Sequence, residues 1–98
     1  MDAMQPATSR VEIENDFSIT TRWTFAPGTS TGWHKHAHDY VVVPVIGGEL
    51  TIVHADGSET VNTLTAGAPY ARPCGTEHDV QNRSHAVVEF LEIEIPRK

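Results

Sequence analysis

Hydrophobic and polar positions alternate along much of the chain with the two-residue period of β-strands. In residues 17–25, one set of alternate positions is largely apolar and the other is polar, and Pro27-Gly28 follows as a break. The face predicted to point inward consists of Phe17, Ile19, Thr21, Trp23 and Phe25. This segment is expected to be a strand that is buried on one side.

Residues 40–46 form a continuous run of apolar residues that is rich in valine. Such a run is typical of a strand buried on both faces. Pro44 interrupts it, because proline has no backbone N–H to donate to a neighbouring strand. We therefore expect a bulge or a free edge near Pro44.

Residues 50–55 and 59–64 flank Asp56-Gly57, a pair that favours the positive φ angles of a tight hairpin. The segment 86–95 alternates from Leu91 onward, with Ile93 and Ile95 on the predicted apolar face. Glu89 occupies the same set of alternate positions as these apolar residues, so a bulge near it is expected.

No window of the chain has the 3.6-residue period of an amphipathic helix. About eight short strands separated by turns predict an all-β fold, an antiparallel sandwich or barrel. Residues 1–9 are expected to be a flexible tail, and residues 10–98 a single domain.

Length and charge narrow the possible functions of the 98-residue chain. Its size allows one hydrophobic core. A net charge of −6, with seven dispersed Lys and Arg residues, argues against a nucleic-acid partner. Cys74 is the single cysteine, and neither a basic leader nor an apolar run of membrane-spanning length is present. A cytoplasmic protein without membrane contact is the expectation.

Histidines are concentrated in two segments. His34, His36 and His38 alternate in one, and His78 lies in the other. Residues two apart on a strand share a face and are about 6.6 Å apart, so His34 and His36 can direct both imidazoles at one metal ion. A third ligand must come from elsewhere, and His78 is the natural candidate if the two segments face each other.

These segments resemble the two motifs of the cupin superfamily of small jelly-roll barrels. Gly28, His34, His36 and Gly47 match the first motif. The second motif is matched at every position by Gly67, Pro73, Gly75, His78 and Asn82. The resemblance implies a jelly-roll fold and a metal site formed by His34, His36 and His78. Residues 39–44 and 90–95 further resemble a group of short single-domain cupins associated with the catabolism of amino acids or small acids.

Tyr40 occupies the position at which the first cupin motif has a metal-binding glutamate. In a straight strand Tyr40 would be about 13 Å from His36, so it can reach the site only if the chain bends near residues 37–39. His38 would then lie in or beside the bend, where we expect it at the rim of the site; the alternative is that it binds the metal. Tyr40 and His38 are the two candidates for a general base near the metal.

Arg72 and Tyr70 occupy positions of the second motif that usually carry apolar side chains directed into the barrel. A buried guanidinium needs an anion. That anion is either a protein carboxylate, such as Glu49 or Glu89, or the carboxylate of a substrate.

The resemblance supports an enzyme with one divalent transition metal per chain (Fe, Mn, Ni or Zn) that acts on a small carboxylate or an amino-acid-derived metabolite. Dioxygenase-like oxidation is the leading reaction, followed by isomerisation or lyase chemistry. The alternative is a non-catalytic module that binds a small metabolite or a metal, as a sensor or accessory protein. A homodimer is expected, because a small core and open sheet edges favour a second copy as partner.

Overall fold

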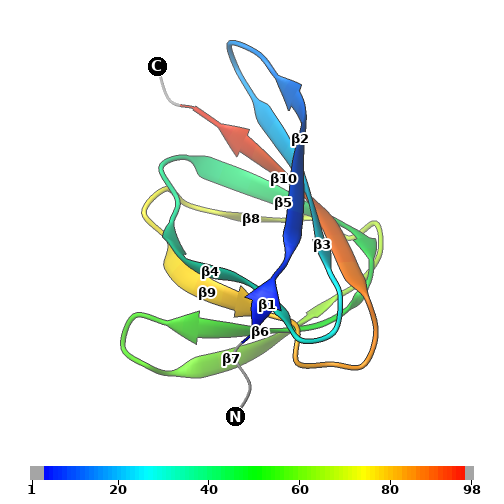
Figure 1. The fold of residues 1–98 in the computed structure, drawn as a ribbon. Helices are drawn as coiled ribbons and strands as arrows, with labels where there is room; N and C mark the ends of the chain where they lie inside the picture. Colours follow the sequence, from blue (N-terminus) through cyan, green and yellow to red (C-terminus); the bar gives the residue numbers. More distant parts are fainter. Residues whose placement is uncertain (1–3, 97–98) are drawn as a thin grey trace.

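The computed structural model describes residues 4–96, which form ten strands in two sheets and no helix (Figure 1). The first sheet has the order β1 (Gln5–Pro6), β4 (Thr29–Lys35), β9 (Glu77–Gln81), β6 (Gly48–His54), β7 (Glu59–Leu64). The second has the order β2 (Thr8–Glu14), β3 (Ile19–Phe25), β10 (Val88–Ile95), β5 (Asp39–Ile46), β8 (Tyr70–Arg72). All neighbouring strands are antiparallel except the short β1–β4 pair. The prediction of an all-β antiparallel sandwich is confirmed.

The hydrophobic core lies between the two sheets and draws on both of them. Its buried members are Phe25, Tyr40, Val42, Leu50, Ile52, Leu64, Val80, Val88 and Phe90. The rings of Phe25 and Phe90 lie 5.5 Å apart at its centre. Burial of these side chains holds the sheets together, since each strand presents only one face to the interior.

The predicted hairpin joins β6 and β7. Gly57 has a φ of +84°, and the Asp56 carboxylate accepts hydrogen bonds from the backbone N–H and the hydroxyl of Ser58. Gly57 is the only residue of the pair with positive φ, because no described residue other than glycine adopts that conformation.

The irregularities expected near Pro44 and near Glu89 are one and the same bulge. Glu89 pairs with Ile46 and Phe90 pairs with Pro44, which leaves Val45 as an extra residue in β5. The prediction that residues 40–46 are buried on both faces is wrong. Alternate residues of β5 are buried only as far as Pro44, and Val45 and Ile46 are 41% and 45% exposed, because this sheet packs on the core with one face.

The expected phase of β10 is also wrong. Val88, Phe90 and Glu92 face the interior, whereas Ile95 is 46% exposed. Pairing with β3 and β5 decides this, since residues directly opposite in a sheet share a face. Phe90 lies opposite Trp23 and Pro44, so Glu92, two residues further, is directed inward as well.

The N-terminal segment differs from the flexible tail expected for residues 1–9. Residues 5–6 pair with β4, and residues 8–9 pair with β3; residues 1–3 lie outside the described part of the chain. Phe17 is not part of a strand face, because it is 67% exposed in the turn between β2 and β3. The side chain of Asn15 accepts hydrogen bonds from the backbone of that turn.

Asn82, a position of the second cupin motif, is completely buried just after β9. Its amide donates to the carbonyl oxygens of Phe25 and Ala86, and its side-chain oxygen accepts from Ser84. These bonds tie the end of β3 to the loop before β10. Within residues 4–96 there is no helix that is long and apolar enough to cross a membrane.

Candidate metal centre

The orientation of the first two histidines depends on a bulge in β4. Ser30 pairs with Gln81 and Trp33 pairs with Asp79, so that Thr31 and Gly32 together face a single residue of β9. Gly32 has a φ of +78°, which glycine adopts without strain. The extra residue changes the alternation of the strand, and His34 then faces the interior while Trp33 faces solvent.

Thr31 and Gly32 also hold the His34 ring. The backbone N–H of Val80, which faces the bulge, donates to the hydroxyl of Thr31. His34 Nδ1 lies 2.9 Å from the carbonyl oxygen of Gly32 and 3.2 Å from Thr31 Oγ1. Because a carbonyl can only accept, Nδ1 carries the hydrogen, and Nε2 presents its lone pair to the centre of the site.

His36 follows β4 directly, at the start of the bend that leads into β5. Its backbone N–H donates to Thr76 and its carbonyl oxygen accepts from Gly75, so the bend is tied to the turn before β9. Tyr40 lies beyond the bend with its ring stacked on the imidazole, 3.9 Å between centroids and 23° between planes. The bend expected near residues 37–39 is therefore present.

Glu92 approaches His36 from β10. Its carboxylate lies 3.4 Å from His36 Nδ1, longer than an ordinary hydrogen bond, and it accepts a hydrogen bond of 3.3 Å from the indole N–H of Trp23. Glu92 is only 8% exposed, and burial, aided by Glu94, raises its pKa to about 7. A buried carboxylate in this position favours a nearby positive charge.

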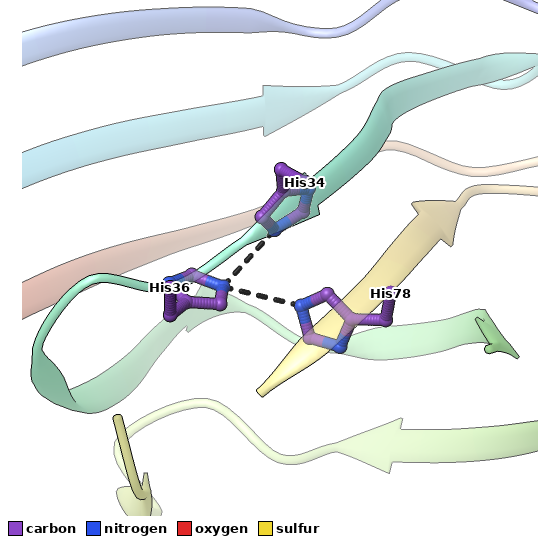
Figure 2. A group of neighbouring side chains, drawn as sticks. All are labelled: His34, His36 and His78. Carbon is purple, nitrogen blue, oxygen red and sulfur yellow. Dashed lines mark hydrogen bonds between the residues drawn. The ribbon is translucent and has the colours of Figure 1, made fainter. Parts of the chain in front are cut away.

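His78, at the start of β9, completes the group, since it lies directly opposite His34. The Nε2 atoms of His34 and His36 are 3.0 Å apart, and those of His36 and His78 are 3.2 Å apart (Figure 2). All three imidazoles offer a ligand atom within 4.8 Å of the others. Two nitrogens bound at about 2.1 Å to one ion are about 3.0 Å apart at a right angle and about 3.4 Å apart at the tetrahedral angle. The cluster therefore fits a metal ion.

The protonation pattern also fits a cation. When Glu92 is ionised, His36 directs an N–H at the carboxylate and turns the lone pair of Nε2 toward that of His34. Two lone pairs at 3.0 Å in a buried site repel each other unless a positive charge lies between them. Burial lowers the pKa of His36 and of His78 to about 4, with further lowering by the other histidines, so both rings are neutral at pH 7 and able to bind metal.

The cluster opens into a small cavity inside the sandwich, with a volume of about 30 Å³. Tyr40, Tyr70, Trp23 and Glu92 contribute to its walls together with the three histidines. A space of this size holds one or two water-sized groups. Larger ligands must extend out of the cavity.

The other residues predicted to form the site differ in how deeply they are buried and in whether they line the cavity. Tyr40 is buried, and burial raises the pKa of its phenol, so it is neutral at physiological pH. Tyr70 is half-buried in the cavity wall. His38 is half-buried in the bend and is not part of the histidine cluster.

Arg72 differs from the expectation of a guanidinium buried in the barrel. It lies opposite Tyr40 on β8, but β8 is an edge strand, and the side chain is exposed. The guanidinium donates to the carbonyl oxygen of Ala71 and lies 4.7 Å above the centroid of the Tyr70 ring. Within residues 4–96 it forms no ion pair, and Glu89, one of its two expected partners, is bound to Arg22 instead.

Histidines that belong to neither cupin motif lie outside the cluster. His54 lies opposite His78 on β6 and binds the hydroxyl of Thr60. Trp33 faces away from the site; it is 50% exposed, and its indole N–H donates to the carboxylate of Glu77.

Sequence reasoning missed Glu92, which it assigned to the outer face of its strand. The alternation of Val88, Phe90 and Glu92 was the available signal, but it competes with the equally regular alternation of Leu91, Ile93 and Ile95. Only the pairing with β3 and β5 selects the correct phase.

Removal of a ligand should abolish metal binding. We expect one divalent metal per chain in the parent protein, and none at stoichiometric level in His36→Ala or His78→Ala, by elemental analysis after purification without a nickel column. His54→Ala is the matched control, because His54 is the cross-strand neighbour of His78 but outside the cluster. Since burial lowers the pKa values of His36 and His78 to about 4, metal should stay bound at about pH 6 and be lost as the pH approaches 4. Full occupancy in His78→Ala would contradict the assignment.

Removal of the carboxylate behind His36 should weaken metal binding without abolishing it. Glu92→Leu is expected to raise the Kd for the metal by about 10- to 100-fold, the usual effect of losing a group that orients a ligand. Glu92→Gln, which retains an acceptor without the charge, should have a smaller effect. Competition titration with a chromophoric chelator measures both values. Glu89→Leu on the outer face of β10 is the control, and equal affinities in Glu92→Leu and Glu89→Leu would disprove the role of Glu92.

Comparisons with known proteins agree with this fold. Residues 21–94 match the family model described as cupin domain. The chain is 43% identical over 95 residues to the beta-alanine degradation protein BauB of Pseudomonas aeruginosa, covering 97% of this chain and 99% of that protein. It is 26% identical over 85 residues to an oxalate-binding protein of Thermotoga maritima, covering 87% of this chain and 68% of that protein.

A solved structure gives the same result at the level of the fold. The crystal structure of a cupin domain from Bordetella pertussis Tohama I superposes with a TM-score of 0.91 at 42% identity, and the match covers 96% of this chain and 97% of that one. Together with the two motifs and the histidine cluster, these matches place the chain in the cupin family, as a small single-domain member.

Proposed function

We propose that this cupin is a metal-dependent enzyme that holds one divalent transition metal (Fe, Mn, Ni or Zn) on His34, His36 and His78. The observation that carries the proposal is a cluster of three imidazoles that opens into a cavity. Structural metal sites are usually closed by four protein ligands, whereas three ligands leave positions for a guest. A metal held there would supply Lewis-acid or redox chemistry.

The proposed substrate is a small carboxylate or an amino-acid-derived metabolite. Arg72 lies at the rim of the barrel without a carboxylate partner in the described residues, in a chain of net charge −6. A guanidinium in this setting can bind a carboxylate through two charge-assisted hydrogen bonds. Two relatives carry names that refer to small acids, the degradation of beta-alanine in one and the binding of oxalate in the other, which supports this substrate class.

Oxidation by dioxygen is the leading reaction, with isomerisation or lyase chemistry as lesser options. Tyr40 lies in the cavity wall as a neutral phenol, so as the proposed catalytic residue it would donate a hydrogen bond or a proton to the bound molecule. Tyr70, Arg72 and His38 would contact the remainder of the substrate. Glu92, also in the wall, has a pKa of about 7, which is suited to accepting a proton at neutral pH.

A non-catalytic module that binds a small metabolite or a metal, as a sensor or accessory protein, is the second candidate. The name of the Thermotoga relative, which refers to binding and to no reaction, favours it. Consumption of a substrate separates the two candidates, because a binding module retains its ligand unchanged.

Calorimetric titration of the metal-loaded protein with small carboxylates, neutral amides and sugars tests the proposal, with dioxygen consumption and product formation followed in parallel. Acids should bind, and neutral analogues should bind at least about tenfold more weakly. Arg72→Leu should weaken the best acid by about tenfold, the effect expected for a charged hydrogen bond at an exposed position. Arg10→Leu changes the net charge equally at a distant, exposed position and should have no effect. Preference for sugars, or unchanged acid binding in Arg72→Leu, would contradict the proposed substrate class.

We also propose a homodimer in which β2 contacts a second copy of the chain. β2 is an edge strand of the second sheet, and all seven of its residues are exposed. Val11 and Ile13 are 55% and 52% exposed. Figure 1 shows this strand and the turn that follows it extending past the body of the sandwich. An edge strand with exposed apolar side chains is a site at which another chain can pair.

Charged residues in β2 should separate the dimer. The parent protein is expected to have the mass of a dimer by light scattering at micromolar concentration, and the double variant Val11→Lys, Ile13→Lys that of a monomer. Val61→Lys, on the edge strand β7 of the other sheet and 61% exposed, should remain dimeric. A monomeric parent protein, or dissociation by Val61→Lys alone, would refute the assignment of β2.

A further inference from the structure

The small cavity at the histidines shares a wall with a larger groove that opens to solvent. The groove has a volume of about 330 Å³ and is lined by Val61, Asn62, Thr63, Leu64, Tyr70 and Arg72. Tyr70 and Leu64 line both spaces. Leu64 is buried in the core, whereas Tyr70 is half-buried at the start of a three-residue edge strand, where it pairs with Val42. Tyr70 is therefore the more exposed of the two residues that separate the cavity from the groove.

The groove exists because the two sheets do not close on this side. β7 is the edge of the first sheet and β8 the edge of the second, and no backbone ladder joins them. The inner faces of both edge strands border the gap, since Asn62 lies opposite the buried Leu50 and Arg72 lies opposite the buried Tyr40. Residues from both sheets can thus contact one molecule in the groove.

The chemistry of the groove suits a carboxylate. Arg72 is its only charged lining residue, and one guanidinium nitrogen donates to Ala71 while the others have no acceptor among the described residues. The amide of Asn62 makes no hydrogen bond with any residue between 4 and 96. A guanidinium and an amide that face the same gap provide N–H donors for both oxygens of one carboxylate.

The sizes of the two spaces determine how an acid can lie. The inner cavity of about 30 Å³ admits one or two water-sized groups but not a whole acid with its carbon chain. An acid that reaches the histidines must therefore leave most of its volume outside the inner cavity, and the groove on the other side of Tyr70 is large enough to hold it. The guanidinium of Arg72 lies 4.7 Å above the centroid of the Tyr70 ring, so an anion bound to Arg72 would lie beside the residue that separates the two spaces.

We propose that the groove between β7 and β8 is the entrance and carboxylate subsite of this cupin, with Arg72 and Asn62 as the anchor and Tyr70 as the gate to the histidines. The ligand is a short bifunctional acid, with a carboxylate in the groove and a metal-binding group, such as an amine, hydroxyl or second carboxylate, at its other end. This inference rests on the proposed metal site and names the substrate class of that site more narrowly.

Metal release tests the gate without reference to any reaction. Tyr70→Ala should accelerate the removal of bound metal by excess EDTA by at least about tenfold, because opening of a lid limits passage through a closed wall. The equilibrium Kd for the metal should stay within about threefold of the parent value, since no ligand changes. Tyr70→Phe keeps the ring and should release metal at the parent rate. Trp33→Ala, which removes an exposed aromatic residue next to His34, is the control for a general loss of rigidity.

Titration of the metal-loaded protein with malonate and propanoate tests the subsite. Malonate, which has a second carboxylate for the metal, should bind at least about tenfold more tightly than propanoate. Asn62→Asp preserves the size of the side chain but repels an anion, and it should weaken malonate by at least about tenfold. Asn62→Leu, which removes the donor without adding charge, should weaken it less. Metal stoichiometry in each variant confirms that the site is folded.

The outcomes distinguish this inference from the proposed function. Absence of stoichiometric metal in the parent protein would refute the proposed function. Stoichiometric metal and tight malonate binding in the parent, with parent-like release in Tyr70→Ala and parent-like malonate affinity in Asn62→Asp, would overturn the gate and subsite alone. Faster release in Trp33→Ala as well as in Tyr70→Ala would also overturn the gate.

Discussion

The site depends on a local constraint in β4, the bulge at Thr31 and Gly32. If the same residues formed a regular strand without the bulge, alternation from the inward-facing Thr31 would place Trp33 inside and turn His34 and His36 toward solvent. The positive φ of Gly32 makes the change of phase possible, and the Thr31 hydroxyl satisfies the Val80 N–H that faces the bulge. The same two residues orient His34 through its Nδ1. One irregularity of the backbone thus determines both the direction of the ligands and the tautomer of one of them.

The first cupin motif lacks its glutamate in this chain, and a carboxylate from another strand lies near the site instead. Tyr40 occupies its position and stacks on His36, where it restricts the ring. A carboxylate is still present, but it is Glu92 on β10, and it faces the far side of His36. A metal in the cluster would therefore be bound by neutral imidazoles. The negative charge, on the carboxylate of Glu92, would lie behind His36 instead of on the metal. That arrangement leaves the metal with more of its positive charge, which favours anionic guests.

Both the small inner cavity and the open edge beside it follow from the packing of two sheets that are not closed. Large core side chains such as Phe25, Phe90 and Leu50 fill the middle of the sandwich and leave only a small space at the histidines. Beside it, the edge strands β7 and β8 leave a polar groove that contains Arg72. Specificity for an acid would then reside mainly in the groove, and reactivity in the cavity.

The sequence by itself determined the features that depend on neighbouring residues in the chain. Alternation identified the strands, Asp56-Gly57 the hairpin, and the two motifs the three histidines, because period, turn geometry and motif spacing are local properties. The tertiary structure decided which face of β10 is buried, and with it the presence of Glu92 at the site. It also decided that Arg72 lies at an edge instead of in the interior. These features depend on the register and order of strands that are distant in sequence, and no local pattern encodes which strand lies beside which.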